Sequence, residues 1–188
     1  MAVILVVALA FLSGALPLSV WIGRWGVGVD IRQVGDGNPG ASNVWRAGGP
    51  RWGWLAIVAD FSKGLIPVAI VNFGLGWDGW ALTAVSIAPV LGHAFSPFLR
   101  FHGGKALAVS FGVWAGLTIW LAPTLLGVGF AIWLKILKRD AWAVLAGVAT
   151  QLVAFLLINA IWGIPWEWFA VWAVMTAVFI WKHKSELK

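Results

Sequence analysis

The sequence has no cysteine and no tyrosine, and only 11% of its 188 residues are charged. The absence of cysteine excludes disulfide bonds and thiolate metal sites. A soluble protein of ordinary composition carries about 25% charged residues, so this chain has too little polar surface for a soluble globule of its length. With 61% hydrophobic residues, the composition indicates an integral membrane protein.

Long apolar runs make up most of the chain and predict helical membrane spans. A helix needs about 20 apolar residues to cross a bilayer, and the runs at residues 2–21, 106–134 and 141–161 approach or exceed this length. They lack the alternating pattern of barrel strands. We therefore expect an all-α integral membrane protein in which residues 1–188 form a single polytopic domain. Divided at turn signals, the chain gives about seven transmembrane helices, at residues 2–23, 53–73, 79–93, 106–121, 123–137, 141–160 and 166–182.

The basic residues are distributed unevenly between the predicted loops. The first, third and fifth loops and the tail carry Lys or Arg, whereas the second, fourth and sixth loops carry none. Because basic loops are retained in the cytoplasm, we expect the N-terminus outside and the C-terminus in the cytoplasm. The loops at residues 30–51 and 93–105 and the tail at residues 182–188 then share the cytoplasmic face. The apolar remainder leaves no basic domain that would bind nucleic acid.

Two charged residues, Asp60 and Lys63, fall inside the second predicted span. They are three positions apart and so lie on one face of a helix. Charges in a span are costly and usually pair with one another or line a functional cavity. A structural ion pair and a Lys63 side chain that reaches toward an anionic site both fit this pattern.

Two loops rich in glycine and basic residues would lie on the cytoplasmic face. Residues 35–46 read GDGNPGASNVWR, and residues 92–105 read GHAFSPFLRFHGGK. Glycine lets backbone N–H groups converge on an anion, and Lys105 adds its charge just before an apolar helix. The glycines of residues 35–40 also match a dinucleotide-binding pattern, but no buried strand precedes them, so we reject that interpretation. The loops predict a phosphate pocket, with ordinary turn structure as the alternative for each.

Other catalytic patterns are absent. His93, His102 and His183 have no cysteine partners and no H-E-x-x-H spacing, so we expect no metal site. No G-x-S-x-G motif exposes a nucleophilic serine. Neither His93 nor His102 has an aspartate four or five residues later, so the His/Asp pair of many acyltransferases is missing. Acyl transfer here would depend on substrate positioning and charge stabilisation.

Residues 17–109 resemble a known family. Residues 30–68, DIRQVGDGNPGASNVWRAGGPRWGWLAIVADFSKGLIPV, and residues 92–108, GHAFSPFLRFHGGKALA, are similar to the two central motifs of the bacterial acyl-phosphate:glycerol-3-phosphate acyltransferases, the PlsY family. The later spans are similar only in hydrophobicity and length. The resemblance implies a seven-helix, multi-pass protein of the bacterial inner (plasma) membrane, with its motif loops at the cytoplasmic face.

The resemblance also implies an activity. Such an enzyme transfers a fatty acyl group from acyl phosphate to the 1-hydroxyl of glycerol 3-phosphate, giving lysophosphatidic acid and phosphate, the first step of phospholipid synthesis. It requires no cofactor. Its partners are the two substrates and membrane lipid, and we expect a monomer. Carried over to this sequence, the catalytic residues are Asn43, Arg46, His93 and Lys105. The substrate-binding residues are Asp36, Gly37, Asn38, Lys63, Ser96, Gly103, Gly104, His183 and Glu186.

The resemblance assigns roles to these groups. Arg46 and Lys105 would neutralise the phosphates of donor and acceptor, and the glycine amides would hold the leaving phosphate. The acceptor's own phosphate can accept the hydroxyl proton, which suits a chain without a His/Asp pair.

Three positions depart from the family pattern. Asp36 stands where the family has serine, and an ionised carboxylate cannot donate a hydrogen bond to phosphate and repels it unless a cation screens it. Ala106 replaces a glycine, and Glu186 stands where the family has asparagine. An inactive or acceptor-altered relative that binds acyl donor or lipid is therefore an alternative. A transporter is another, but it would bury charges across several spans, and here only Asp60 and Lys63 are expected to be buried charges.

Overall fold

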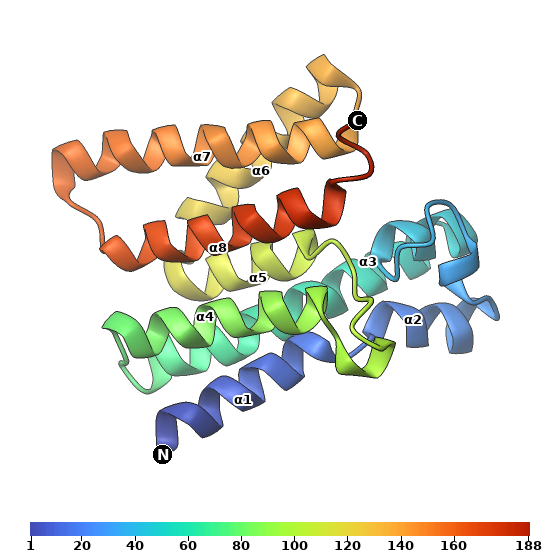
Figure 1. Cartoon of the computed structure of the whole chain (residues 1–188), viewed down its shortest axis with the longest axis horizontal. Helices are drawn as coiled ribbons and strands as arrows, with labels where there is room; N and C mark the ends of the chain where they lie inside the picture. The colour runs from blue at the N-terminus through green and yellow to red at the C-terminus, as the bar shows by residue number, and fades with distance from the viewer.

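The computed structural model describes residues 1–188, and its regular elements are all helical (Figure 1). The all-α prediction is confirmed. The longer helices are α1 (Ala2–Ala15), α3 (Ala41–Ala69), α4 (Gly79–Ala94), α5 (Leu107–Thr118), α6 (Leu121–Leu137), α7 (Asp140–Trp162) and α8 (Trp166–His183). The shorter elements are α2 (Leu18–Ile22), η1 (Gly23–Val27), η2 (Ile31–Gln33), η3 (Ile70–Gly74) and η4 (Pro97–Leu99).

Each predicted span corresponds to a helix or to consecutive helical segments. Four helical stretches are long and apolar enough to cross a membrane: Ala2–Val27, Ala41–Gly74, Gly79–Leu99 and Asp140–Trp162. Two further apolar helices, Leu107–Thr118 and Leu121–Leu137, are shorter. At about 1.5 Å per residue, α5 alone is shorter than a bilayer core of about 30 Å.

The second span begins differently from the prediction. The sequence predicts a helix from residue 53, whereas α3 begins at Ala41 and contains a break at Gly49, whose φ of 74° and ψ of −171° are not helical. Pro50 follows, and proline suits the first turn of a helix because its missing N–H has no partner there. The residues before the break form a separate helical segment, which carries Asn43 and Arg46.

The predicted boundary at residues 121–123 is wrong. The chain breaks earlier, where α5 ends at Thr118 and Ile119 has a positive φ of 58°. Pro123 lies inside the first turn of α6 rather than between two helices. A proline in the first helical turn removes no backbone hydrogen bond, so this proline did not mark a loop.

Close helix crossings depend on glycine. In the contact between α3 and α5, a Cβ added to Gly64 would lie 2.3 Å from the carbonyl oxygen of Val109, and one added to Gly112 would lie 2.0 Å from that of Phe61. Small residues let membrane helices approach closely. Larger side chains at these positions would force α3 and α5 apart.

Asp60 and Lys63 form a buried ion pair with 2.9 Å between Nζ and Oδ1. Lys63 Nζ also donates to the carbonyl oxygen of Leu16 at 2.8 Å, and the hydroxyl of Ser19 donates to Asp60 at 2.6 Å. The carbonyl oxygen of Leu16, at the end of α1, also accepts the backbone N–H of Leu18 at 2.9 Å. The pair therefore attaches α3 to the break between α1 and α2.

The two termini lie at opposite ends of the bundle (Figure 1). The segment before α3, the segment between α4 and α5, and the C-terminal tail meet at one end, where Lys105 contacts both Asp36 and Glu186. The opposite end joins α4 to α8, where Trp80 and Trp166 lie 4.2 Å apart between ring centroids. Helix packing thus brings the two motif loops and the tail together.

Candidate active site

Asp36 is the centre of the first motif loop. Its Oδ1 accepts hydrogen bonds from the backbone N–H of Asn38 at 3.1 Å and from Nδ2 of Asn43 at 2.9 Å. Gly35 and Gly37, on either side, have positive φ angles of 59° and 73°. Glycine adopts this conformation without strain, so the two glycines let the loop turn tightly around the carboxylate.

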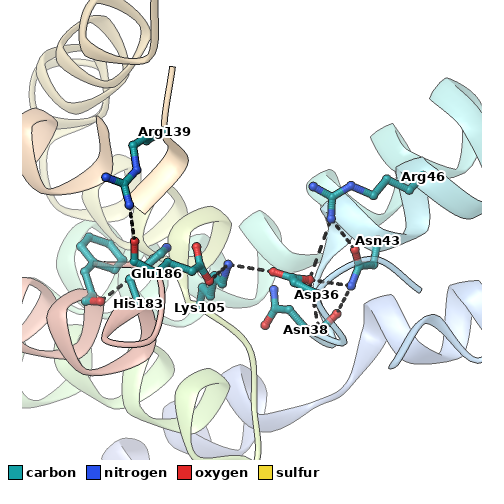
Figure 2. A network of polar contacts seen from close by, with 9 residues as sticks. Asp36, Asn38, Asn43, Arg46, Lys105, Arg139, His183 and Glu186 are labelled. Carbon is teal, nitrogen blue, oxygen red and sulfur yellow. Dashed lines mark hydrogen bonds and ion pairs between the residues drawn. The ribbon is translucent and has the colours of Figure 1, made fainter. Parts of the chain in front are cut away.

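Asn43 connects Asp36 to Arg46 (Figure 2). Its fully buried side chain also donates to the carbonyl oxygen of Asn38 at 2.9 Å, while its own Oδ1 accepts from Arg46 at 2.9 Å. Arg46 lies 3.9 Å from Asp36. Because Asn43 and Arg46 are on the first two turns of α3, the helix fixes their spacing, and Asn43 holds the guanidinium toward Asp36.

Lys105 joins the first loop to the rest of the site. Its Nζ lies 2.8 Å from Oδ2 of Asp36 and 2.5 Å from Oε1 of Glu186, between the loop and the C-terminal tail (Figure 2). Burial alone would raise the pKa of Asp36, but hydrogen bonds from Lys105, Asn38 and Asn43 lower that pKa to about 2. Burial alone would lower the pKa of Lys105, but the two carboxylates raise it. Asp36 and Lys105 are therefore both charged at neutral pH.

Gly103 and Gly104 pack against His93. A Cβ on Gly104 would lie 2.3 Å from Nε2 of His93, and a Cβ on Gly103 would lie 1.9 Å from the carbonyl oxygen of His93. That carbonyl accepts the N–H of Gly104 at 3.1 Å. The expectation that glycine amides hold the leaving phosphate therefore needs correction at Gly104, whose amide is used within the protein. The pair of glycines instead lets the loop pass close to the buried imidazole.

Two other predicted site residues are also engaged within the protein. The hydroxyl of Ser96 is buried and donates to the carbonyl oxygen of Ala15 at 2.6 Å, which anchors the loop to the end of α1. The amide of Gly37 donates to the carbonyl oxygen of Val34 at 3.1 Å. These groups shape the loops, and neither presents a free donor to a ligand.

Ala106 adopts the left-handed conformation that the family pattern assigns to glycine. Its φ is 66°, which costs an alanine about 1 kcal/mol or more relative to glycine. The departure noted in the sequence thus falls on a position that requires a positive φ.

The C-terminal tail closes one side of the site. Lys182 Nζ donates to the carbonyl oxygen of Gly103 at 2.8 Å, and His183 lies buried with Nδ1 2.9 Å from the carbonyl oxygen of Phe179. Arg139 donates to the carbonyl oxygen of Glu186 at 3.2 Å (Figure 2). Arg139 and Lys182 were not among the predicted site residues. Their position in basic loops on the same side was the only sequence signal for them.

A cavity of about 280 Å³ opens between these groups. Its polar lining comes from the two motif loops and from helices α3, α4, α7 and α8, and includes Asp36, Asn38, Arg46, Asp60, His93, Lys105, Asp140 and His183. Its apolar lining comes from four helices, through Ile57, Leu107, Phe130 and Val144. One cavity is therefore lined by both cations and hydrocarbon surface, which suits a molecule with a phosphate and an alkyl chain. No group of three or more His, Asp or Glu side chains could hold a metal ion.

The structure thus brings most of the predicted site residues to one place. Asp36, Asn38, Asn43, Arg46, His93, Gly103, Gly104, Lys105, His183 and Glu186 surround or support the cavity. The ammonium of Lys63 is engaged within the protein by Asp60 and by the carbonyl oxygen of Leu16. The catalytic and binding roles stay predictions.

The chain matches the family described as glycerol-3-phosphate acyltransferase over residues 4–188. The chain belongs to the glycerol-3-phosphate acyltransferase family. The resemblance seen in the sequence is thereby confirmed. It also extends beyond residues 17–109, so the three C-terminal helices, which hydrophobicity alone had suggested, are part of the family match.

Relatives from several bacteria cover nearly the whole chain. A glycerol-3-phosphate acyltransferase 1 from Thermotoga maritima is 37% identical, with 97% of this chain and 94% of that protein covered. A glycerol-3-phosphate acyltransferase from Desulforudis audaxviator is 36% identical, with 100% and 91% covered.

Solved structures of the acyltransferase family have the same fold. A crystal structure of PlsY (YgiH), an integral membrane glycerol 3-phosphate acyltransferase, in its glycerol 3-phosphate form has a TM-score of 0.87 at 29% identity, covering 100% of this chain and 90% of that one. The lysophosphatidic acid form has a TM-score of 0.82 at 30% identity, with the same coverage. The prediction of an integral membrane protein is confirmed.

Proposed function

We propose that the chain transfers a fatty acyl group from acyl phosphate to the 1-hydroxyl of glycerol 3-phosphate at the cytoplasmic face of the bacterial inner membrane. Its coarser function follows from its family: it is a membrane glycerol-3-phosphate acyltransferase of phospholipid synthesis. The observation that supports the finer proposal is that one cavity is lined by Arg46 and Lys105 and by apolar side chains. A long acyl chain with a phosphate at its end needs both surfaces.

The proposed reaction uses charge stabilisation rather than a side-chain nucleophile. The 1-hydroxyl oxygen attacks the acyl carbonyl carbon, the bond from that carbon to the phosphate oxygen breaks, and phosphate leaves with the electron pair. The hydroxyl proton passes to the acceptor's phosphate and then to the released phosphate. Arg46 and Lys105 neutralise the phosphates, and fixed cations stabilise developing charge without reorganising during the reaction.

His93 fits this scheme as a positioning residue. Its buried ring lines the cavity and packs against Gly104, next to Lys105. Replacing the imidazole would free the backbone at Gly104 and move the Lys105 ammonium. We propose that His93 acts through this contact.

We propose that the motif end of the molecule faces the cytoplasm and that the N-terminus lies outside. The first, third and fifth loops and the tail carry the basic residues, and the two motif loops meet the tail through Lys105. Basic loops are retained on the cytoplasmic side. The expected partners are the two substrates and membrane lipid, with the chain acting as a monomer.

An acceptor-altered or inactive relative is the second candidate, because Asp36 and Glu186 both pair with Lys105. The test is to purify the protein in lipid and follow phosphate release from palmitoyl phosphate with glycerol 3-phosphate, then with neutral and amine acceptors. Release only with glycerol 3-phosphate is the expected result. Release with another acceptor alone supports an altered acceptor. No release with any acceptor, with the Asp36→Ser variant also silent, overturns the proposal.

A further inference from the structure

We propose that Asp36 and Glu186 are internal competitors for the phosphate site: they pair with the ammonium of Lys105, and a substrate phosphate competes with them for that ammonium. This inference rests on the proposed function, because it takes the polar side of the cavity as the place where phosphate binds. It adds two carboxylates that set phosphate affinity without taking part in the chemistry.

Two carboxylates contact the ammonium of Lys105. Asp36 approaches the ammonium from the first loop at 2.8 Å, and Glu186 approaches it from the tail at 2.5 Å. An ammonium has three N–H donors, and two are directed at carboxylates. Only 22% of the Lys105 side chain is exposed. One donor is left, so a phosphate oxygen that binds this largely buried ammonium does so beside the two carboxylates and competes with them for it.

The positive and negative charges of the cluster cancel. Arg46 and Lys105 contribute two positive charges to the cluster, and Asp36 and Glu186 contribute two negative charges, so the net charge of these four groups is zero. A phosphate gains little from a neutral cluster, because attraction to the cations is cancelled by repulsion from the carboxylates. Once one carboxylate moves away, the phosphate meets a net positive site.

Both carboxylates are placed where they can move away. Each has a side chain that is 35% exposed, so water can solvate the displaced group. Asp36 is on a loop turned by two glycines, and Glu186 follows the last helical residue, His183. The neighbouring Arg139 holds the tail through backbone oxygens of Glu186 and Lys188 rather than through the carboxylate. Either side chain can thus leave Lys105 without unwinding a helix.

This arrangement makes a specific prediction about affinity. A competitor at Lys105 weakens the binding of any phosphate there, whether substrate or product, and is indifferent to the length of the acyl chain. The Asp36→Asn variant removes the charge and keeps a carbonyl oxygen that can accept the N–H of Asn38. The Glu186→Gln variant removes the other charge without changing the size of the side chain.

The experiment measures equilibrium binding of inorganic phosphate to the purified full chain in lipid nanodiscs. Because partly exposed ion pairs contribute modestly, we expect each variant, Asp36→Asn and Glu186→Gln, to bind phosphate about three- to tenfold more tightly, and the double variant more tightly still. The matched controls are Asp30→Asn, which breaks an ion pair with Arg32 elsewhere in the first loop, and Glu167→Gln at the opposite end of the bundle. Both controls should bind within twofold of the unmodified chain. Unchanged or weaker binding by folded Asp36→Asn and Glu186→Gln overturns the inference.

Acyl transfer measured on the same samples separates this inference from the proposed function. If the variants bind phosphate more tightly but none of the samples transfers the acyl group to any acceptor, the proposed function is refuted and the competitor mechanism stands. Transfer with unchanged phosphate affinity would leave the function standing and refute the competitor mechanism.

Discussion

The ammonium of Lys105 lies 2.8 Å from a carboxylate oxygen of Asp36, although 69 positions separate the two residues in the chain. The contact joins the two motif loops directly, and Asn43 extends it to Arg46. A group that binds between these cations therefore touches both loops at once. Removing one member of this cluster should change how the remaining members bind a ligand.

Replacing Lys105 should abolish acyl transfer. In the Lys105→Met variant, Asp36 and Glu186 lose their shared counter-ion, and a phosphate would meet two uncompensated carboxylates. We expect phosphate release from palmitoyl phosphate to fall by about 100-fold or more, the scale seen when one charge-stabilising donor is lost. Lys135→Met, which removes an exposed lysine near the end of α6, is the matched control. Near-normal turnover of folded Lys105→Met would exclude this lysine from the active site.

Adding a methyl group at Gly104 should disrupt the site through His93. The added Cβ would lie 2.3 Å from Nε2 of His93, and forcing extra volume into a packed region costs about 1–3 kcal/mol. We expect the Gly104→Ala variant to unfold at a lower temperature and to lose most of its activity. Gly74→Ala is the control, because a Cβ there meets nothing within 4 Å. Equal thermal stability of the two variants would show that the His93 contact does not constrain the loop.

Asp60 and Lys63 should matter for stability rather than for substrate binding. Lys63→Met leaves a buried carboxylate without its partner, which typically costs about 3–5 kcal/mol of folding stability. The double variant Asp60→Leu, Lys63→Met removes both charges and should recover most of that loss. Its KM for glycerol 3-phosphate should stay within about twofold of the unmodified value. A large rise in KM in the stable double variant would assign Lys63 to the substrate site.

The ion pair between Asp36 and Lys105 should stabilise the fold over a wide pH range. The pKa of Asp36 falls from its ordinary 3.8 to about 2 on folding, so its contribution is fully present above about 3.8 and is lost as pH falls toward 2. The raised pKa of Lys105 keeps that residue's contribution until pH rises through the raised value. The difference in melting temperature between the unmodified chain and Asp36→Asn should therefore be constant from pH 5 to 9. A difference that disappears near pH 6 would contradict an ionised Asp36.

Hydrophobic length was sufficient to predict the helices but not their ends. Apolar runs indicate which segments are buried in lipid, and the structure has a helix at each of the seven spans that they predict. The break at Gly49 and the end of α5 near Ile119 depend on backbone angles. Pro123, which separated two spans in the prediction, lies in the first turn of α6 instead.

The sequence by itself determined the all-α membrane architecture, the family and the two motif loops, because composition, apolar length and motif spacing are properties of neighbouring residues. Only the tertiary structure decided which groups are free to bind a ligand. It directs the amide of Gly104 to His93 and the hydroxyl of Ser96 to Ala15, 81 positions away. It also brings Asp36 and Glu186 to the same ammonium. Such partners come from distant helices, and the packing of those helices sets their distances.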